Sequence, residues 1–151
     1  MASQPKNQNY LHSSQLPQLL IDEEFKIKLL KNERWEELKM TSLCKILYCL
    51  FLKYPKGITL YELGNHQEEL VTMYQRLCWE YPDRNQFIKD RITELICRCN
   101  NSVYEKISRI KALFNEHLSS DLAHWYHIKG ERGQAKRIAL PRQRVIVHCS
   151  F

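Results

Sequence analysis

Glycine and proline are scarce in this chain of 151 residues, which holds four glycines and five prolines. Because turn-rich β-sandwiches and low-complexity sequences need more of both, their scarcity favours a helical protein. The longest apolar stretch, residues 46–52, is far shorter than the run of about eighteen that crosses a membrane. The first residues are polar and lack the apolar segment of a secretory signal peptide. We therefore expect six reduced cysteines and a cytoplasmic protein.

The sequence also lacks the local motifs of common enzyme classes. It contains no phosphate-cradling glycine loop, no dinucleotide-binding fingerprint and no nucleophile elbow. A zinc site can be assembled on paper from cysteine and histidine pairs. However, a single residue separates Cys97 from Cys99, and this spacing is too short for the usual pairs of zinc ligands. We therefore expect no enzymatic activity, no cofactor and no metal site.

The basic excess of the chain is concentrated in its last third. The formal net charge is +6. Residues 102–151 hold nine Lys and Arg against four acidic residues, whereas residues 1–101 hold fourteen against thirteen. Such a concentration is the footprint expected of a face that binds a polyanion. The alternative is a solvated surface with a chance asymmetry.

The N-terminal third predicts an arm and then a small sheet. Residues 1–20 are polar and predict a flexible arm, followed by one domain over residues 21–151. Residues 25–29 alternate apolar and basic side chains, which predicts a strand with one buried face. Trp35 and Leu38 either continue this sheet or belong to a helix.

Three segments with apolar side chains at three- and four-residue spacing predict the first helices. The first begins after Thr41 or Ser42, either of which can cap it, and ends at the turn over residues 54–57. The second covers about residues 60–81, or is interrupted at Gly64 and Asn65, with Asn65 as the cap of a separate helix. An extra helix follows over residues 84–98.

Residues 102–118 predict a helix with two chemically different faces. Its apolar side chains share one side and are expected to pack inward: Val103, Ile107, Ile110 and Phe114. The other side is left to Tyr104, Ser108, Arg109, Lys111 and Asn115. A basic hairpin is expected over residues 127–140 with its turn at residues 130–133, and a last strand over residues 144–147. A polar, basic helix face beside a basic β-ribbon is what a winged helix offers to DNA.

The order of these elements resembles a winged-helix domain, and more narrowly the DNA-binding effector domain of OmpR/PhoB-type response regulators. The similarity includes the first helix with its glycine-containing turn, residues 38–58, and the basic hairpin turn, residues 128–133. It also includes the string Ile-Ser-Arg-Ile-Lys at residues 107–111, which is similar to the core of the family's recognition helix. The resemblance covers roughly residues 25–140. It departs from the family in the longer connection over residues 66–99, and we expect no receiver domain.

The resemblance implies a mostly helical α+β fold, a winged helix with small N-terminal strands and a C-terminal β-hairpin as its wing. It also implies double-stranded DNA binding by a transcriptional regulator. Helix 102–118 would read the major groove and the wing over residues 127–140 would contact flanking DNA. A homodimer is expected if the target has two half-sites.

Arg109 is the first candidate for base reading, because its guanidinium matches the two acceptors of guanine. The other candidates for contact with DNA are Tyr104, Lys106, Ser108, Lys111, Asn115, Lys129, Arg132, Lys136 and Arg137. Each group has an ordinary alternative. Arg109 could form a surface ion pair with Glu105, one turn earlier. The hairpin charges could protect an edge strand from aggregation, and Tyr104 could lie at the edge of the core.

Two further function classes stay open. Winged helices also serve as protein-interaction modules with no nucleic-acid role. Residues 66–99 would then form the partner surface, through the apolar side chains Cys78, Trp79, Tyr81 and Phe87. The third class is binding of single-stranded RNA or DNA by stacking on Tyr104, Trp125 or Tyr126.

Overall fold

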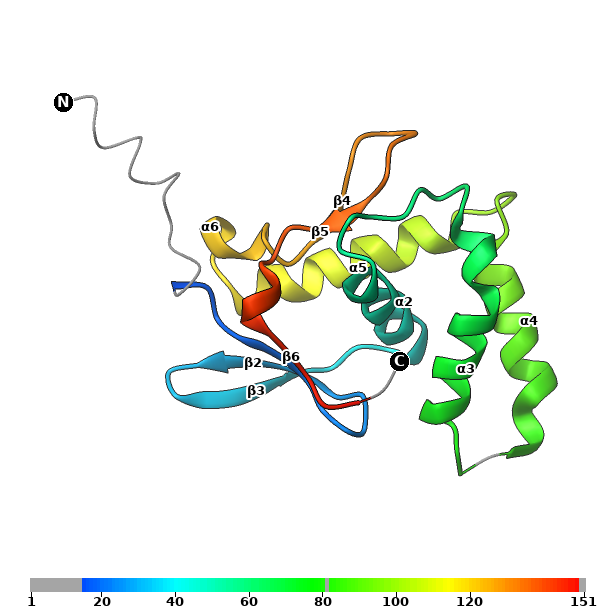
Figure 1. Cartoon of the computed structure of the whole chain (residues 1–151), viewed down its shortest axis with the longest axis horizontal. Helices are drawn as coiled ribbons and strands as arrows, with labels where there is room; N and C mark the ends of the chain where they lie inside the picture. Colours follow the sequence, from blue (N-terminus) through cyan, green and yellow to red (C-terminus); the bar gives the residue numbers. More distant parts are fainter. Residues whose placement is uncertain (1–14, 81, 150–151) are drawn as a thin grey trace.

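The computed structural model describes residues 15–80 and 82–149, which form a four-stranded sheet, a group of helices and a two-stranded hairpin (Figure 1). About half of these residues are helical, which confirms the predicted α+β class. None of the described helices is both long and apolar enough to cross a bilayer.

The predicted boundary of the N-terminal arm, residue 20, is too late in the chain. Leu16 and Leu19 are buried in the core, so the folded part begins before residue 21. The start of the folded part was not predicted, because the apolar side chains that enter the sheet directly follow a polar stretch. Residues 1–14 of the predicted arm lie outside the described residues.

The sheet has the strand order β3-β2-β1-β6. Its members are β1 (Leu19–Ile21), β2 (Ile27–Lys31), β3 (Arg34–Leu38) and β6 (Val145–Val147). β1 pairs antiparallel with β2 and parallel with β6, so the last strand of the described chain joins the first. The strand expected over residues 144–147 is therefore present.

Strand β2 begins at Ile27, later than the strand predicted over residues 25–29, because Asp22 forms a turn there. Its Oδ1 accepts the backbone N–H groups of Glu24 and Lys26, both at 2.9 Å. Phe25 has a φ of 62°, and a residue in this left-handed region does not continue a strand.

Trp35 and Leu38 belong to the sheet and not to a helix. β2 and β3 are antiparallel neighbours, joined by the two-residue turn Asn32–Glu33. The φ angles of Asn32 and Glu33 are 50° and 64°. Positive φ at both central residues is the geometry of a type I′ turn, whose twist matches that of the flanking strands.

The helices are α2 (Ser42–Lys53), α3 (Gln67–Leu77), α4 (Asn85–Ile96), α5 (Ser102–His117) and the short α6 (Ser120–Ala123). Single 3₁₀ turns lie at Leu63–His66, Pro82–Arg84 and Arg142–Arg144. The extra helix predicted over residues 84–98 is present as α4, and the helix predicted over residues 102–118 is α5. The helix predicted over residues 60–81 is shorter, because a turn at Thr59, whose Oγ1 accepts the N–H of Glu62, and a 3₁₀ turn precede α3.

α2 is the central helix and is buried on nearly every side. Thr41 caps it as predicted, since its Oγ1 accepts the N–H of Cys44 at 3.4 Å. Tyr48 of α2 contacts Phe114 of α5, which stacks on Tyr126, with ring centroids 5.2 and 5.3 Å apart. The Tyr48 hydroxyl donates to the carbonyl of Tyr126 at 2.7 Å. This buried aromatic chain fixes α5, and the chain that enters the hairpin, against α2.

The predicted hairpin is formed by β4 (Ile128–Lys129) and β5 (Arg137–Ile138), with a turn closed by the N–H of Gln134 on the carbonyl of Glu131. In Figure 1 it lies over α5, beside the loop that follows α2. Lys136, just before β5, forms a β-bridge with Ile58 in that loop.

Candidate nucleic-acid interface

The exposed surface of α5 has two separate edges, because the helix buries Val103, Ile110 and Phe114 on its third side. The residues of one edge recur at four- and three-residue spacing and are all exposed: Tyr104, Ser108, Lys111 and Asn115. We call this the hairpin-side edge. Oδ1 of Asn115, on this edge, accepts a hydrogen bond of 2.9 Å from Nε2 of His127. His127 is buried and directly precedes β4. This bond shows that the edge faces the hairpin.

Arg109 lies on the other edge of α5, with Glu105 and Glu116. Its Nη2 is 2.8 Å from Glu105 Oε1, so the ion pair weighed as an alternative is present. Side chains two residues apart on a helix do not face each other, and Arg109 therefore points away from Lys111. It lines a shallow hollow of about 240 Å³ with Thr41 and Glu116. The prediction that Arg109 shares one face of the helix with Ser108 and Lys111 is therefore wrong.

Lys106 is also away from the hairpin-side edge. Its side chain is only 13% exposed, and its Nζ lies 3.5 Å from Glu105 Oε1. The backbone carbonyl of Lys106 faces the thiol of Cys44 on α2, so this part of α5 packs against the central helix. Of the candidates on α5, Tyr104, Ser108, Lys111 and Asn115 share one surface.

Two cations of the hairpin lie directly opposite each other. The register pairs Lys129 with Arg137, both exposed, and pairs Ile128 with Ile138, both buried. The hairpin therefore has an apolar face against the protein and a cationic face outward. Like charges directly opposite each other on a sheet are unfavourable.

The cations of the hairpin and of α5 converge on His127. Burial lowers the pKa of His127 below its ordinary value, and the charges of Lys111 and Lys129 lower it further, together with His124. Lys129 Nζ lies 3.4 Å from His124 Nδ1. Lys111 on α5 and Lys129 on β4 thus both lie close enough to His127 to act on its pKa.

Two glycines allow the hairpin to approach the loop after α2 closely. Gly57 has a φ of 101°, and a Cβ there would lie 2.8 Å from the carbonyl oxygen of Lys136. A Cβ on Gly130 would clash with the carbonyl oxygen of Ala135 in the opposite arm. Side chains at either position would push the backbones apart, so the location of the hairpin depends on both.

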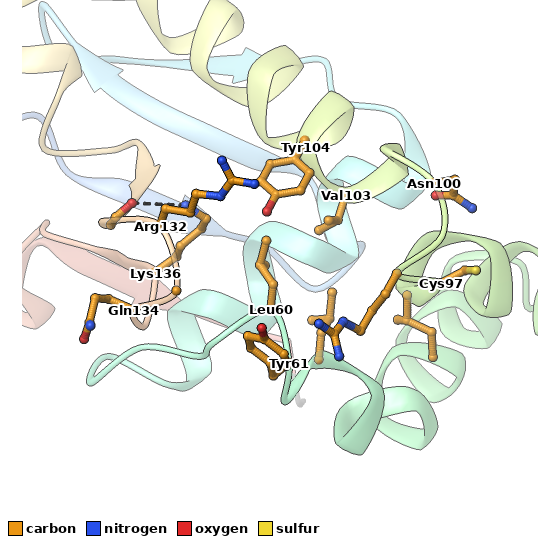
Figure 2. Close-up of a pocket in the computed structure, with 14 residues that line it drawn as sticks. Leu60, Tyr61, Cys97, Asn100, Val103, Tyr104, Arg132, Gln134 and Lys136 are labelled. Atoms are coloured by element: carbon orange, nitrogen blue, oxygen red, sulfur yellow. Dashed lines mark hydrogen bonds between the residues drawn. The ribbon is translucent and has the colours of Figure 1, made fainter.

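A cleft of about 660 Å³ opens at the start of α5, between the hairpin turn and the loop after α2 (Figure 2). Tyr61 and Tyr104 line it and are 66% and 50% exposed. Its charged lining residues are all cationic: Arg98, Arg132 and Lys136. Figure 2 shows Arg132 extending from the hairpin toward Tyr104. Lys136 Nζ donates to the carbonyl of Gly130 at 3.1 Å and so bridges the two arms.

Tyr61 and Arg98 also line this cleft, and neither is among the site residues predicted from the sequence. The guanidinium carbon of Arg98 lies 3.9 Å from the centroid of the Tyr61 ring. The two residues belong to different loops, one after α2 and one after α4, and neither stands in a local motif. No pattern along the chain brings them together, because their contact depends on how α3 and α4 pack.

The aromatic candidates outside this region have different fates. Tyr126 is wholly buried, so stacking of a base on Tyr126 is excluded. Trp79 is 74% exposed after α3, and Phe87 is 44% exposed on α4 beside the guanidinium groups of Arg84 and Arg91. Cys78 is half-buried. Tyr81 lies outside the described residues.

Within residues 15–80 and 82–149, no three His, Cys, Asp or Glu side chains gather closely enough to hold a metal ion. The chain matches no known protein family, no curated protein and no solved structure. The geometry and charge of the described residues are therefore the basis for assigning a function.

Proposed function

We propose that this chain is a winged-helix protein that binds double-stranded DNA as a transcriptional regulator. The observation that carries the proposal is that Lys111 on α5 and Lys129 of the hairpin both act on His127, with Arg137 directly opposite Lys129. Holding three cations together costs stability, and a polyanion bound across them removes that cost. Protection of an edge strand, the alternative weighed for these charges, accounts for a lysine on a strand but not for the adjacent cation on α5.

The proposed arrangement follows from the size and chemistry of the grooves. The major groove admits one α-helix, and the hairpin-side edge of α5 would enter it with Ser108 and Lys111 toward the base edges. Lys129 and Arg137 would bind phosphates beside the groove and fix the register. The hairpin follows α5 as the wing follows the recognition helix in a winged helix. The small sheet before α2 is consistent with the resemblance to the OmpR/PhoB-type effector domain.

The geometry supports Lys111 above Arg109 as the first contact of α5 with DNA. Lys111 lies on the edge that faces the hairpin cations. The Arg109 guanidinium is paired with Glu105, and this ion pair would have to open before Arg109 could read a base. Arg109 would therefore contribute less to affinity than Lys111.

The test is fluorescence anisotropy with labelled duplex DNA at several salt concentrations. The logarithm of the affinity should fall with the logarithm of the salt concentration by about 0.9 for each phosphate neutralised. Lys111→Ala should weaken binding by about 1–3 kcal/mol through the loss of a base contact, whereas Lys129→Ala should reduce the salt slope by about 1. Lys89→Ala removes the same charge from an exposed position on α4 and is the matched control.

The results that would overturn the proposal are a flat salt response or equal binding by the Lys111→Ala and Lys89→Ala variants. Arg109→Ala distinguishes the two edges of α5. A larger loss from Arg109→Ala than from Lys111→Ala would mean that the far edge of α5 enters the groove.

The exposed aromatic side chains of α3 and α4 support a second candidate function, a protein-interaction surface over residues 66–99. Trp79 and Phe87 are large, apolar and exposed at the same end of these two helices. Under the DNA proposal, Trp79→Ala leaves the affinity for duplex DNA unchanged. A wild-type protein that does not bind any DNA would favour the interaction surface.

A further inference from the structure

We propose that the cleft at the start of α5 binds an unpaired nucleotide, so that the protein prefers a DNA duplex that continues into a single strand. The inference rests on the proposed function, because the duplex is taken to lie along the hairpin-side edge of α5. The observation that links the two is the position of Tyr104. This residue belongs to the hairpin-side edge and also lines the cleft.

The cleft has the size and the side chains that a nucleotide requires. Its volume of about 660 Å³ lies within the range of about 300–1,000 Å³ of pockets that hold small ligands. Its charged lining residues are three cations and include no acid, which suits a phosphate group. Two exposed tyrosine rings supply flat apolar surfaces on which a base can stack.

Tyr61 is held in a position suited to stacking. The Arg98 guanidinium lies over its ring at 3.9 Å from the centroid, yet the Tyr61 side chain stays 66% exposed. One face of the ring is therefore covered by a cation, and the ring remains accessible to a base. The cation over the ring also adds positive potential where the phosphate of the stacked nucleotide would lie.

A base in an intact duplex cannot use this site. Its two faces are covered by the neighbouring base pairs, so stacking on a tyrosine requires a base that has left the stack. The cleft is also a hollow between the hairpin turn and the loop after α2, whereas a duplex offers a convex surface of phosphates (Figure 2). An unpaired nucleotide fits the hollow, and its strand continues along Tyr104 toward the duplex on α5.

The experiment compares three labelled probes by fluorescence anisotropy with the full chain. The first probe is a blunt duplex. The second is the same duplex with a short thymidine extension at the 5′ or the 3′ end of one strand, and the third is the extended strand alone. We expect the extended duplex to bind at least about fivefold more tightly than the blunt duplex, as stacking of one base allows. Tyr61→Ala should abolish this gain and leave binding to the blunt duplex unchanged. Tyr61→Phe should retain the gain, because a phenyl ring stacks equally well.

Trp79→Ala is the matched control, since it removes an exposed aromatic side chain outside the cleft and should leave the gain intact. Equal affinity for the blunt and extended duplexes would overturn the inference and leave the proposed function standing. Absence of binding to every duplex would instead overturn the proposed function. Equal affinity for the extended duplex and the extended strand alone would overturn the inference, because the duplex would then contribute nothing. Displacement of the extended duplex by an equal concentration of thymidine monophosphate would overturn it in favour of a free nucleotide.

Discussion

Ile58 and Lys136 exchange two backbone hydrogen bonds, each of 2.9 Å, and so join the loop after α2 to the second arm of the hairpin. The Ile58 side chain is buried, and Gly57 before it adopts a φ of 101°. On the opposite side, the first arm of the hairpin is tied to α5 by the bond from His127 to Asn115. The hairpin is thus held from both sides, which places its cations beside α5.

Gly57→Ala should destabilise the protein by about 1–3 kcal/mol, because an L side chain is strained at this φ and its Cβ would lie 2.8 Å from the Lys136 carbonyl. Urea unfolding followed by circular dichroism measures the loss. Gly64→Ala is the control, since a Cβ there meets no atom within 4 Å. Equal stability of the two variants would show that the contact between Ile58 and Lys136 does not need the glycine.

Glu33→Gly should stabilise the protein by about 0.5–1 kcal/mol, because Glu33 occupies the second central position of a type I′ turn at a φ of 64°. Glycine adopts this conformation without a steric cost, and the exposed Glu33 side chain is not part of the core. Thermal and urea unfolding check the change. Asn32→Gly should give a smaller gain, since asparagine already tolerates positive φ. A loss of stability in Glu33→Gly would contradict the turn geometry.

Glu69→Gln should destabilise the protein by about 1.5–3 kcal/mol at neutral pH, through the loss of charge-assisted hydrogen bonds. The Glu69 carboxylate accepts hydrogen bonds from Lys53, Tyr54 and His66 at 2.7–2.8 Å, which join α3 to the end of α2. Burial raises the pKa of Glu69, but these partners outweigh burial and lower it to about 2.

The stability contributed by Glu69 should be complete above its unfolded pKa of about 4.5 and be lost as the pH falls toward 2. Urea unfolding across this range measures the loss. Glu68→Gln, at the neighbouring exposed position, is the control and should change little. A Glu69→Gln variant as stable as Glu68→Gln would contradict the prediction.

His127 should make the wild-type protein less stable in mild acid. Burial and the neighbouring cations lower its pKa in the folded state, so the unfolded chain takes up a proton first as the pH falls. Stability from this group is complete above about pH 6.5, the unfolded pKa, and is lost as the pH falls below it. Unfolding free energies at about pH 7.5 and about pH 5 should therefore differ more for the wild type than for His127→Gln. His148→Gln removes an exposed histidine that does not act on the pKa of His127, and it is the control that should retain the wild-type difference.

The sequence pattern predicted correctly those helices and strands whose characteristic residue spacing lies within one continuous segment. The periodic apolar side chains of α2, α4 and α5 are short-range features, and so is the cap at Thr41. The hairpin was predicted from its alternating side chains and its glycine-containing turn. The boundaries were less accurate where a side chain forms a turn, as Asp22 does before β2.

The sequence by itself determined the class of the fold, the basic character of its last third and the two-faced pattern of α5, because these depend on composition and on neighbours three or four positions apart. Helical spacing also separates Arg109 from Lys111, so the prediction that both share one face was wrong on the sequence pattern itself. Only the tertiary structure decided that the edge with Lys111 faces the hairpin, and that Tyr61, Arg98 and Arg132 surround one cleft. The reason is that packing of Phe114 against the buried ring of Tyr48 sets the rotation of α5, and contacts between distant segments cannot be read from local spacing.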